Sequence, residues 1–431
     1  MSCTEMEMEE IKSSFANISN RLEDYEHHSD GDIFAGRIEM MKQGMAANSQ
    51  VLDRTCKPIS GFLADRPRKD NALAWSSVKS GFTFHDMLPY FYQDWFGTPE
   101  FAKVKSLFGK TVAEHCKDWE SVAVLGAGAC GLLYSVADDF QVSYGVDLSL
   151  PTLLAAKQFI QGEPLAFHLQ RADWHKVELT PPESTANDIR YVVSDVLNMP
   201  FSNGSLSVVI TQYMLDFISN PKRLAEEIYR VLKPGGLWIN FSNPCRIPGD
   251  PIELGRRKLN ELPVFFEKMG FDVLGMENER FALLNLEKIY PEAGNNQQLV
   301  HFLTLRKNEN DSNLLGNGKS IQRFFNPNDS VWCEIPRIVK GRELTFARKK
   351  SFGEQGGNRE AIEISVAGHS FSVPADFALL LEMIFASVDG KNSLRKLFTA
   401  VHEKGIGLNE DAFLQLIYVL HVQHYLIDLD D

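Results

Sequence analysis

The sequence predicts an α/β fold built on a doubly wound, mostly parallel sheet, with a helical region before it and a smaller α+β unit after it. Two observations lead to this fold class. From Val122 to about residue 306, apolar runs typical of buried strands alternate with helical patterns, as in repeated βαβ units. The first unit, residues 122–147, contains a strand, a glycine-rich turn, a helix and a second strand that ends on Asp147.

The glycine-rich turn has the spacing G-x-G-x-x-G at Gly126, Gly128 and Gly131. The first two glycines let the backbone turn tightly and lie close to a ligand, and the third lets helix and strand approach each other. Asp147, at the tip of the next strand, can accept two hydrogen bonds from a ribose diol. The pattern therefore predicts a nucleotide-like ligand at the start of the helix, and the alternative is a glycine-rich turn that binds nothing.

Bulk properties narrow the class of protein. The chain has 431 residues, 44% hydrophobic and 23% charged, which is typical of a globular protein of two or three domains. Its net charge of −13 and the lack of a basic block argue against nucleic acid as a partner. The six cysteines contain no C-x-x-C pair, so we expect neither a metal site nor disulfides. With no signal-peptide or membrane-span pattern, the expected location is the cytoplasm.

Residues 1–118 are expected to form an N-terminal helical cap region. Apolar residues recur at helical spacing near the start, and a methionine group and an aromatic group follow. The aromatic stretch is expected to form two helices broken at residues 97–99, with Thr98 capping the second. The aromatic side chains either pack a helix against the sheet, which we favour, or line a lid over the ligand. The apolar residues are Ile11, Phe15, Ile18 and Leu22, and the methionines, interpreted as packing residues, are Met40, Met41 and Met45.

Residues 119–306 are expected to form the ligand-binding domain. The last two strands are predicted to pair as a hairpin-like antiparallel edge of the sheet. Asn220 is the predicted cap of the helix before the fifth strand. The remaining predicted strands are 190–194, 206–211, 237–241, 271–276 and 299–305, the helices are 150–161, 220–232 and 263–269, and 167–179 is predicted to be irregular.

Residues 307–330 are polar and rich in Asn and Gly, which predicts a linker. Residues 331–431 are expected to form a winged-helix-like α+β domain. Its predicted strands are 331–346, 361–373 and 425–429, and its predicted helices are 374–387, 393–403 and 409–422.

Two further features bear on the ligand. Asp195 follows the third strand, where its carboxylate can accept from an adenine amino group. The stretch from Arg230 to Gly236, RVLKPGG, precedes the fifth strand. The glycine loop alone fits a dinucleotide or S-adenosylmethionine, and these two features favour the second.

Four stretches, LGAGACG, GVDLS, SDVLNMPFSNGSLSVVI and EEIYRVLKPGGLWIN, resemble in order and spacing the motifs of class I S-adenosylmethionine-dependent methyltransferases. The resemblance implies a Rossmann-like sheet, S-adenosyl-L-methionine as cofactor and methyl transfer as the reaction. The cofactor contacts that it implies are Gly126, Ala127, Gly128, Asp147, Leu148, Asp195, Val196 and Gln212.

More distantly, the chain resembles the carnosine N-methyltransferase family, in YFYQDWF before the core, in Asp216 of QYMLDFISN and in LKPGGLWINFSNP. This implies N-methylation of a small peptide or of an imidazole- or amine-bearing small molecule. Asp216 would face the acceptor, hold its nitrogen or take its proton, although it can also simply cap a helix. Tyr213 and Asn243 can hydrogen-bond the acceptor. Arg246 lies in NPCRIPGDP, which lacks the His that the family has there.

The C-terminal unit resembles PqqD-like peptide-binding domains in its Asp389-Gly390 turn and apolar spacing. That resemblance implies capture of a leader peptide along a strand edge, and the alternative is a module for dimerisation or regulation. For the whole chain, two functions of a different class also fit the glycine loop: a cofactor-binding scaffold without catalysis and a nicotinamide-dependent oxidoreductase. The sequence does not predict the oligomeric state.

Overall fold

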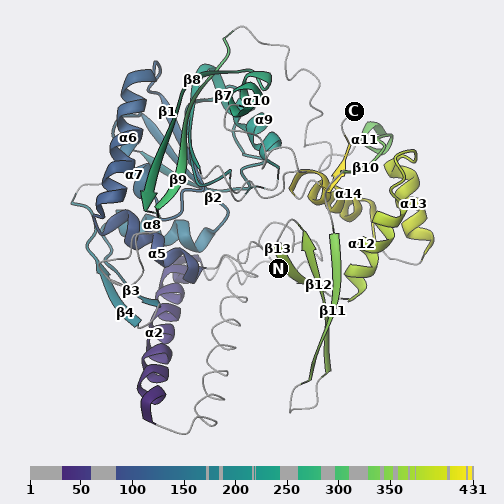
Figure 1. Cartoon of the computed structure of the whole chain (residues 1–431), viewed down its shortest axis with the longest axis horizontal. Helices are drawn as coiled ribbons and strands as arrows, with labels where there is room; N and C mark the ends of the chain where they lie inside the picture. The colour runs from purple at the N-terminus through teal and green to yellow at the C-terminus, as the bar shows by residue number, and fades with distance from the viewer. Residues whose placement is uncertain are drawn as a thin grey trace.

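The structure is a computed structural model, and its described elements run from α2, which begins at Asp32, to the final strand (Figure 1). The predicted helix that carries Ile11, Phe15, Ile18 and Leu22 lies outside the residues that the structure describes. The described residues are 32–59, 84–170, 174–183, 188–215, 218, 220–242, 261–282, 297–309, 329–339, 344–352, 358–366, 369–373, 375–404, 408–423 and 426–429.

The core of the fold is a seven-stranded sheet of order β5-β2-β1-β6-β7-β9-β8. The first five of these strands run parallel, and β9 pairs antiparallel with both β7 and β8. The predicted parallel sheet with an antiparallel edge is therefore confirmed. The strands are β1 Ser121–Leu125, β2 Val142–Asp147, β5 Ile189–Val193, β6 Leu206–Gln212, β7 Leu232–Ser242, β8 Phe271–Ala282 and β9 Gln297–Lys307.

The strand β1 lies between β2 and β6. The chain continues from β1 to β2 and β5 on one side and then to β6 and β7 on the other, so the order of the strands reverses at β1. In open α/β sheets the ligand crevice lies outside the carboxyl ends of the strands at such a switch point. All five residues of β1 are buried, because helices cover both faces of the sheet. The helices of this part of the chain are α2 Asp32–Cys56, η1 Lys57–Ile59, α5 Phe84–Trp95, α6 Pro99–His115, α7 Gly131–Ala137, α8 Leu150–Ile160, α9 Pro221–Val231 and α10 Glu261–Lys268.

Alternate residues of the central strands enter two different cores. Val122 and Val124 of β1 pack with residues of α2, α5, α6, α7 and α8, whereas Ala123 and Leu125 pack with α9 and α10. The period of two in a strand produces this division. Met45 of α2 is buried, but Met40 is 44% exposed, so only part of the predicted methionine packing is present.

Helix starts follow the predicted caps. The Thr98 hydroxyl accepts from Phe101 N at 3.3 Å, with Pro99 as the first residue of α6. The Asn220 side chain accepts from Arg223 N at 3.1 Å at the start of α9. Each cap satisfies a backbone donor that has no partner within its helix.

The prediction of an irregular segment at residues 167–179 is wrong. Strands β3 Leu165–Gln170 and β4 Trp174–Leu179 form an antiparallel pair there. Leu165, Phe167 and Leu169 are buried and alternate with the less buried Ala166 and His168, which is the period of two of a strand. Asn48 of α2 fixes the pair by donating to His168 O at 2.8 Å and accepting from His168 N at 2.7 Å.

The C-terminal elements lie beside the sheet domain in Figure 1. The three predicted helices are present, but the predicted strand at 331–346 is wrong at its start, where α11 forms instead. Strands β11, β12 and β13 make a three-stranded antiparallel sheet, and β10 pairs with β14. The elements are α11 Asp329–Trp332, β10 Arg337–Ile338, β11 Leu344–Phe352, β12 Asn358–Val366, β13 His369–Val373, α12 Ala375–Ser387, α13 Leu394–Glu403, α14 Glu410–Tyr418, η4 Val419–Gln423 and β14 Ile427–Asp428.

Candidate functional site

The glycine loop joins β1 to α7 at the switch point of the sheet. Gly126 and Gly128 have φ of 66° and 49°, the left-handed region that glycine adopts without strain. Gly126 N and Ala127 N both donate to Val146 O, at 2.8 and 3.0 Å, which ties the loop to β2. The loop therefore presents bare backbone at the carboxyl edge of the sheet.

Two methionine side chains lie over this backbone. A Cβ built on Gly126 would lie 2.2 Å from Met214 Cε, and one on Gly128 would lie 3.0 Å from Met87 Cε. Unbranched thioether side chains repack easily. The space next to the glycines is thus filled by movable groups, which suits the close approach of a ligand to the loop.

Asp147, the last residue of β2, faces the loop. Its Oδ2 accepts from Gly128 N and its Oδ1 from Ser149 N, each at 2.9 Å. Burial raises the pKa of the Asp147 carboxyl, and the hydrogen bonds from the backbone oppose that rise. Because each carboxylate oxygen has two lone pairs, both oxygens can still accept from a diol.

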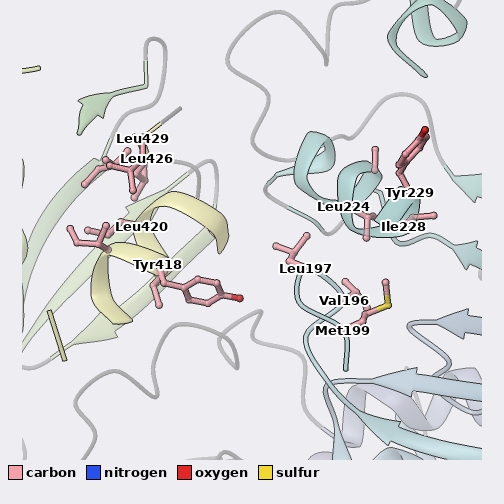
Figure 2. Packing of buried hydrophobic residues seen from close by; sticks show 14 of the residues in the cluster. Val196, Leu197, Met199, Leu224, Ile228, Tyr229, Tyr418, Leu420, Leu426 and Leu429 are labelled. Carbon is pink, nitrogen blue, oxygen red and sulfur yellow. The ribbon is translucent and has the colours of Figure 1, made fainter. Parts of the chain in front are cut away.

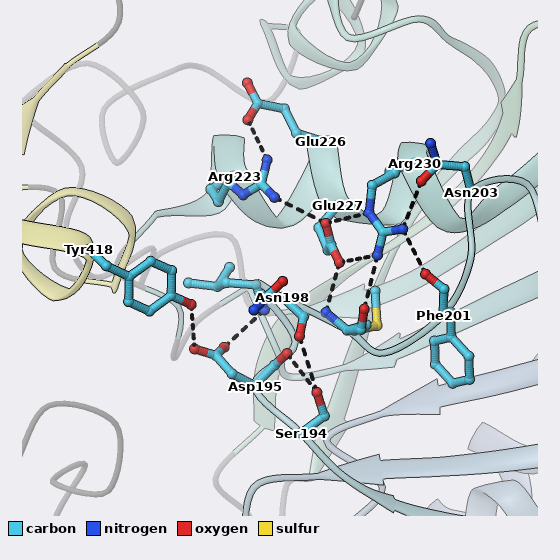
Figure 3. Close-up of polar contacts among 12 residues, drawn as sticks. Ser194, Asp195, Asn198, Phe201, Asn203, Arg223, Glu226, Glu227, Arg230 and Tyr418 are labelled. Carbon is cyan, nitrogen blue, oxygen red and sulfur yellow. Dashed lines mark hydrogen bonds and ion pairs between the residues drawn. The ribbon is translucent and has the colours of Figure 1, made fainter. Parts of the chain in front are cut away.

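Asp195 lies on the neighbouring loop. Ser194 N donates to Asp147 O at 3.0 Å, which places the end of β5 beside the end of β2. The Asp195 Oδ1 accepts from Leu197 N at 2.9 Å, and its Oδ2 accepts from the Tyr418 hydroxyl at 3.5 Å (Figure 3). Val196 is buried in the core next to it.

The end of β6 completes this edge of the sheet. Gln212 is the last residue of β6, and Tyr213 follows with φ of 51°. Tyr213 N donates to Phe241 O at 2.7 Å, and its ring packs edge-on against Phe241 at 5.1 Å. A left-handed tyrosine costs about 1 kcal/mol or more and is commonest at functional sites. The turn carries the chain back over Gly126, where Met214 lies.

The structure brings most of the predicted contacts to one edge of the sheet, at the carboxyl ends of β1, β2, β5 and β6. Asp216, Asn243 and Arg246 lie outside the described residues. The roles of all these residues in binding or catalysis stay predictions. The residues at the edge are Gly126, Ala127, Gly128, Asp147, Leu148, Asp195, Val196, Gln212 and Tyr213.

Sequence reasoning missed a second support of the glycine loop, which comes from α5. The Asp94 Oδ2 accepts from Gly131 N at 3.0 Å, and Trp95 Nε1 donates to Ala129 O at 2.8 Å. The Trp95 ring also packs against Phe159 of α8 at 5.0 Å, so this residue packs against a helix and not, as the favoured prediction had it, against the sheet. Burial raises the pKa of the Asp94 carboxyl to about 7. The only signal for this support in the sequence was one acid, Asp94, within the aromatic stretch.

Within the described ranges, no group of three or more His, Cys, Asp or Glu side chains lies close enough to hold a metal ion. Of the helices described, none combines the length and apolar character needed to cross a membrane.

The sheet order, the glycine loop at the switch point and the acids after β2 and β5 define a Rossmann-like fold of the class I methyltransferase type. Residues 124–240 match a family model described as a methyltransferase domain. The chain thus contains such a domain, and S-adenosylmethionine is its cofactor.

Two curated relatives align with parts of the chain. Demethylmenaquinone methyltransferase of Protochlamydia amoebophila is 40% identical over 52 residues, 12% of this chain and 22% of the relative. Sterol 4-C-methyltransferase strm-1 of Caenorhabditis elegans is 28% identical over 127 residues, 30% of each chain. The chain therefore spans less than a third of the length of either relative.

Among solved structures, the chain is similar to a Haemonchus contortus phosphoethanolamine N-methyltransferase 2 that contains S-adenosylhomocysteine. The TM-score is 0.38 and the identity 15%, and the similarity covers 56% of this chain and 61% of that one.

Proposed function

We propose that this protein transfers the methyl group of S-adenosylmethionine to a nitrogen atom of a small peptide or of an imidazole- or amine-bearing small molecule. The observation that supports it best is the meeting of the glycine loop, Asp147 and Asp195 at one edge of the sheet within the matched methyltransferase region. The choice of acceptor rests on the sequence resemblance.

The described residues suit each part of the cofactor. The bare backbone at Gly126 and Gly128 takes the amino-acid end, and the Asp147 carboxylate accepts from the ribose hydroxyls. Asp195 accepts from the adenine amino group, and Val196 packs against the ring. Asp94 gives the α-ammonium group a carboxylate partner beside the loop, and that positive charge would favour its ionised form. The bound cofactor supplies an electrophilic methyl group.

The protein's own contribution is chiefly positioning. A nitrogen nucleophile needs its lone pair aimed at the methyl carbon, and holding two reactants in that geometry removes much of the entropic barrier. We assign Tyr213, Asp216, Asn243 and Arg246 to the acceptor, with Asp216 as the group that holds the nitrogen or accepts its proton.

A methyl-transfer assay with labelled cofactor tests this function directly. The full chain is incubated with a panel of histidine- and amine-bearing metabolites and short peptides, and Asp216→Asn serves as the paired variant. We expect transfer to at least one nitrogen acceptor and a loss of at least about 100-fold in kcat with Asp216→Asn. Cofactor binding without transfer to any acceptor would instead indicate a binding scaffold.

A peptide-modifying enzyme and an oxidoreductase would each give a different result. If the C-terminal unit captures a leader peptide, transfer will occur only to acceptors that carry a long peptide extension. An oxidoreductase would be stabilised against thermal unfolding by a nicotinamide dinucleotide rather than by S-adenosylhomocysteine.

A further inference from the structure

The C-terminal unit reaches the loop that carries Asp195. One hydrophobic core runs from the α9 face of the sheet into the C-terminal helices, and it includes Leu197, Leu224 and Tyr418. Figure 2 shows the Tyr418 ring extending from α14 toward Leu197 and Val196. Tyr418 is only 6% exposed. The contact thus joins two parts of the chain that are 223 residues apart.

The polar end of Tyr418 meets the predicted adenine ligand. Its hydroxyl donates to Asp195 Oδ2 at 3.5 Å, while Leu197 N donates to the other carboxylate oxygen at 2.9 Å (Figure 3). Burial, and then the charge of Asp195, raise the pKa of the Tyr418 phenol well above its usual value. Tyr418 therefore stays protonated at neutral pH and remains a donor to Asp195.

The far end of the same loop is fixed by α9. Met199 N donates to the buried Glu227 carboxylate at 2.7 Å, and Arg230 donates to Met199 O at 3.0 Å. With one end held by α9, the position of the Asp195 side chain depends on the donors at its two oxygens. One of those donors belongs to the C-terminal unit.

We propose that the C-terminal unit completes the adenine end of the cofactor site, with Tyr418 as a positioning residue that orients the Asp195 carboxylate toward the 6-amino group. This inference rests on the proposed function, in which Asp195 binds the adenine of S-adenosylmethionine. It implies that cofactor binding and docking of the C-terminal unit are coupled, since each favours the same position of the loop.

The test uses Tyr418→Phe in the full chain, which removes one hydroxyl and keeps the ring. Dissociation constants are measured by calorimetry for S-adenosylhomocysteine and for S-inosylhomocysteine, whose 6-oxo group cannot donate a hydrogen bond. We expect the variant to lose about 5- to 20-fold in affinity for the adenine ligand and less than about 2-fold for the inosine ligand. Tyr229→Phe is the matched control, because Tyr229 is buried in the same core but contacts Phe271 and Lys307.

A double-mutant cycle with Asp195→Asn provides the second measurement. If Tyr418 acts through Asp195, Tyr418→Phe will have little further effect once Asp195 is replaced. Equal losses for both ligands, no loss, a gain in affinity, or additive effects in the cycle would each overturn the positioning role. If the unaltered chain binds neither ligand, the proposed function itself fails. If the unaltered chain binds the adenine ligand and Tyr418→Phe binds it equally well, only the positioning role fails.

Discussion

The Asp94 carboxylate accepts a hydrogen bond from the Gly131 N–H at 3.0 Å, and this contact joins α5 to the first residue of α7. The approach is so close that a Cβ on residue 131 would lie 2.5 Å from Asp94 Cβ. Burial raises the pKa of Asp94 from 3.8 to about 7, in spite of the hydrogen bond from Gly131. An acid of α5 that titrates near neutral pH therefore lies against the end of the glycine loop.

Asp94→Asn should stabilise the ligand-free protein at alkaline pH. Between pH 4 and 7, Asp94 is protonated in the folded state and ionised in the unfolded state, so the free energy of unfolding falls as pH rises through this window. The asparagine still accepts from Gly131 N but has no charge to bury. Denaturant unfolding should show a gain of about 1–3 kcal/mol at pH 8 and little change at pH 4. A pH-independent difference would contradict the assigned titration.

The same acid should make cofactor affinity depend on pH. If Asp94 pairs with the α-ammonium group, S-adenosylhomocysteine will bind more tightly as pH rises from 5.5 to 8, because the carboxyl must ionise to form the pair. Asp94→Asn should abolish this slope and weaken binding at pH 8 by roughly 10-fold. A slope that survives the substitution would assign the titration to another group.

Gly126→Ala should weaken cofactor binding while the protein remains folded. The residue has φ of 66°, and an added Cβ would meet Met214 Cε at 2.2 Å. We expect a loss of affinity for S-adenosylhomocysteine of at least about 10-fold and a loss of stability of roughly 1–2 kcal/mol. Gly109→Ala is the control, since Gly109 lies inside α6 with open space around its Cβ position. That change should stabilise the helix by about 0.5–1 kcal/mol and leave binding intact.

The predictable part of this fold is the part encoded over short distances. The βαβ unit, the caps at Thr98 and Asn220 and the left-handed glycines depend on neighbours within a few residues, so the pattern reveals them. The β3–β4 pair is local too, because Leu165, Phe167 and Leu169 alternate with less buried residues, a pattern that the sequence does contain. Asp94 and Tyr418 act over separations of 37 and 223 residues. Contacts of that kind leave no local signal in one sequence.

Glu227→Ala should destabilise the fold strongly. The Glu227 side chain is 1% exposed, bonds Arg223 and Arg230 at 3.0 and 2.6 Å, and accepts from Met199 N (Figure 3). Its removal leaves the partly buried Arg230 guanidinium without its carboxylate and takes one of two carboxylates from Arg223, so we expect a loss of about 3–5 kcal/mol in chemical denaturation. Glu226→Ala, whose side chain is more exposed and contacts Arg223 at 3.3 Å, should cost less than about 1 kcal/mol. Equal losses for the two variants would show that the buried network is not the cause.

His301 should make the protein sensitive to acid. It lies in β9, is 1% exposed, and its Nε2 has no hydrogen-bond partner among the described residues. Burial lowers the pKa of His301 from 6.5 to about 4. The unfolded state therefore binds the extra proton first, and this contribution to stability, complete above pH 6.5, is lost as pH falls toward 4.

Denaturant titrations at several pH values would measure this effect against His301→Gln, which retains hydrogen-bonding groups but does not titrate. Because burial of the glutamine has its own cost, the slopes are compared rather than the absolute stabilities. The unaltered protein should lose about 1–3 kcal/mol more than the variant between pH 7 and 4.5. The sign is opposite to that of Asp94, whose burial penalty grows as pH rises, so Asp94→Asn provides an internal contrast. Parallel curves for the unaltered protein and His301→Gln would show that another group unfolds the protein in acid.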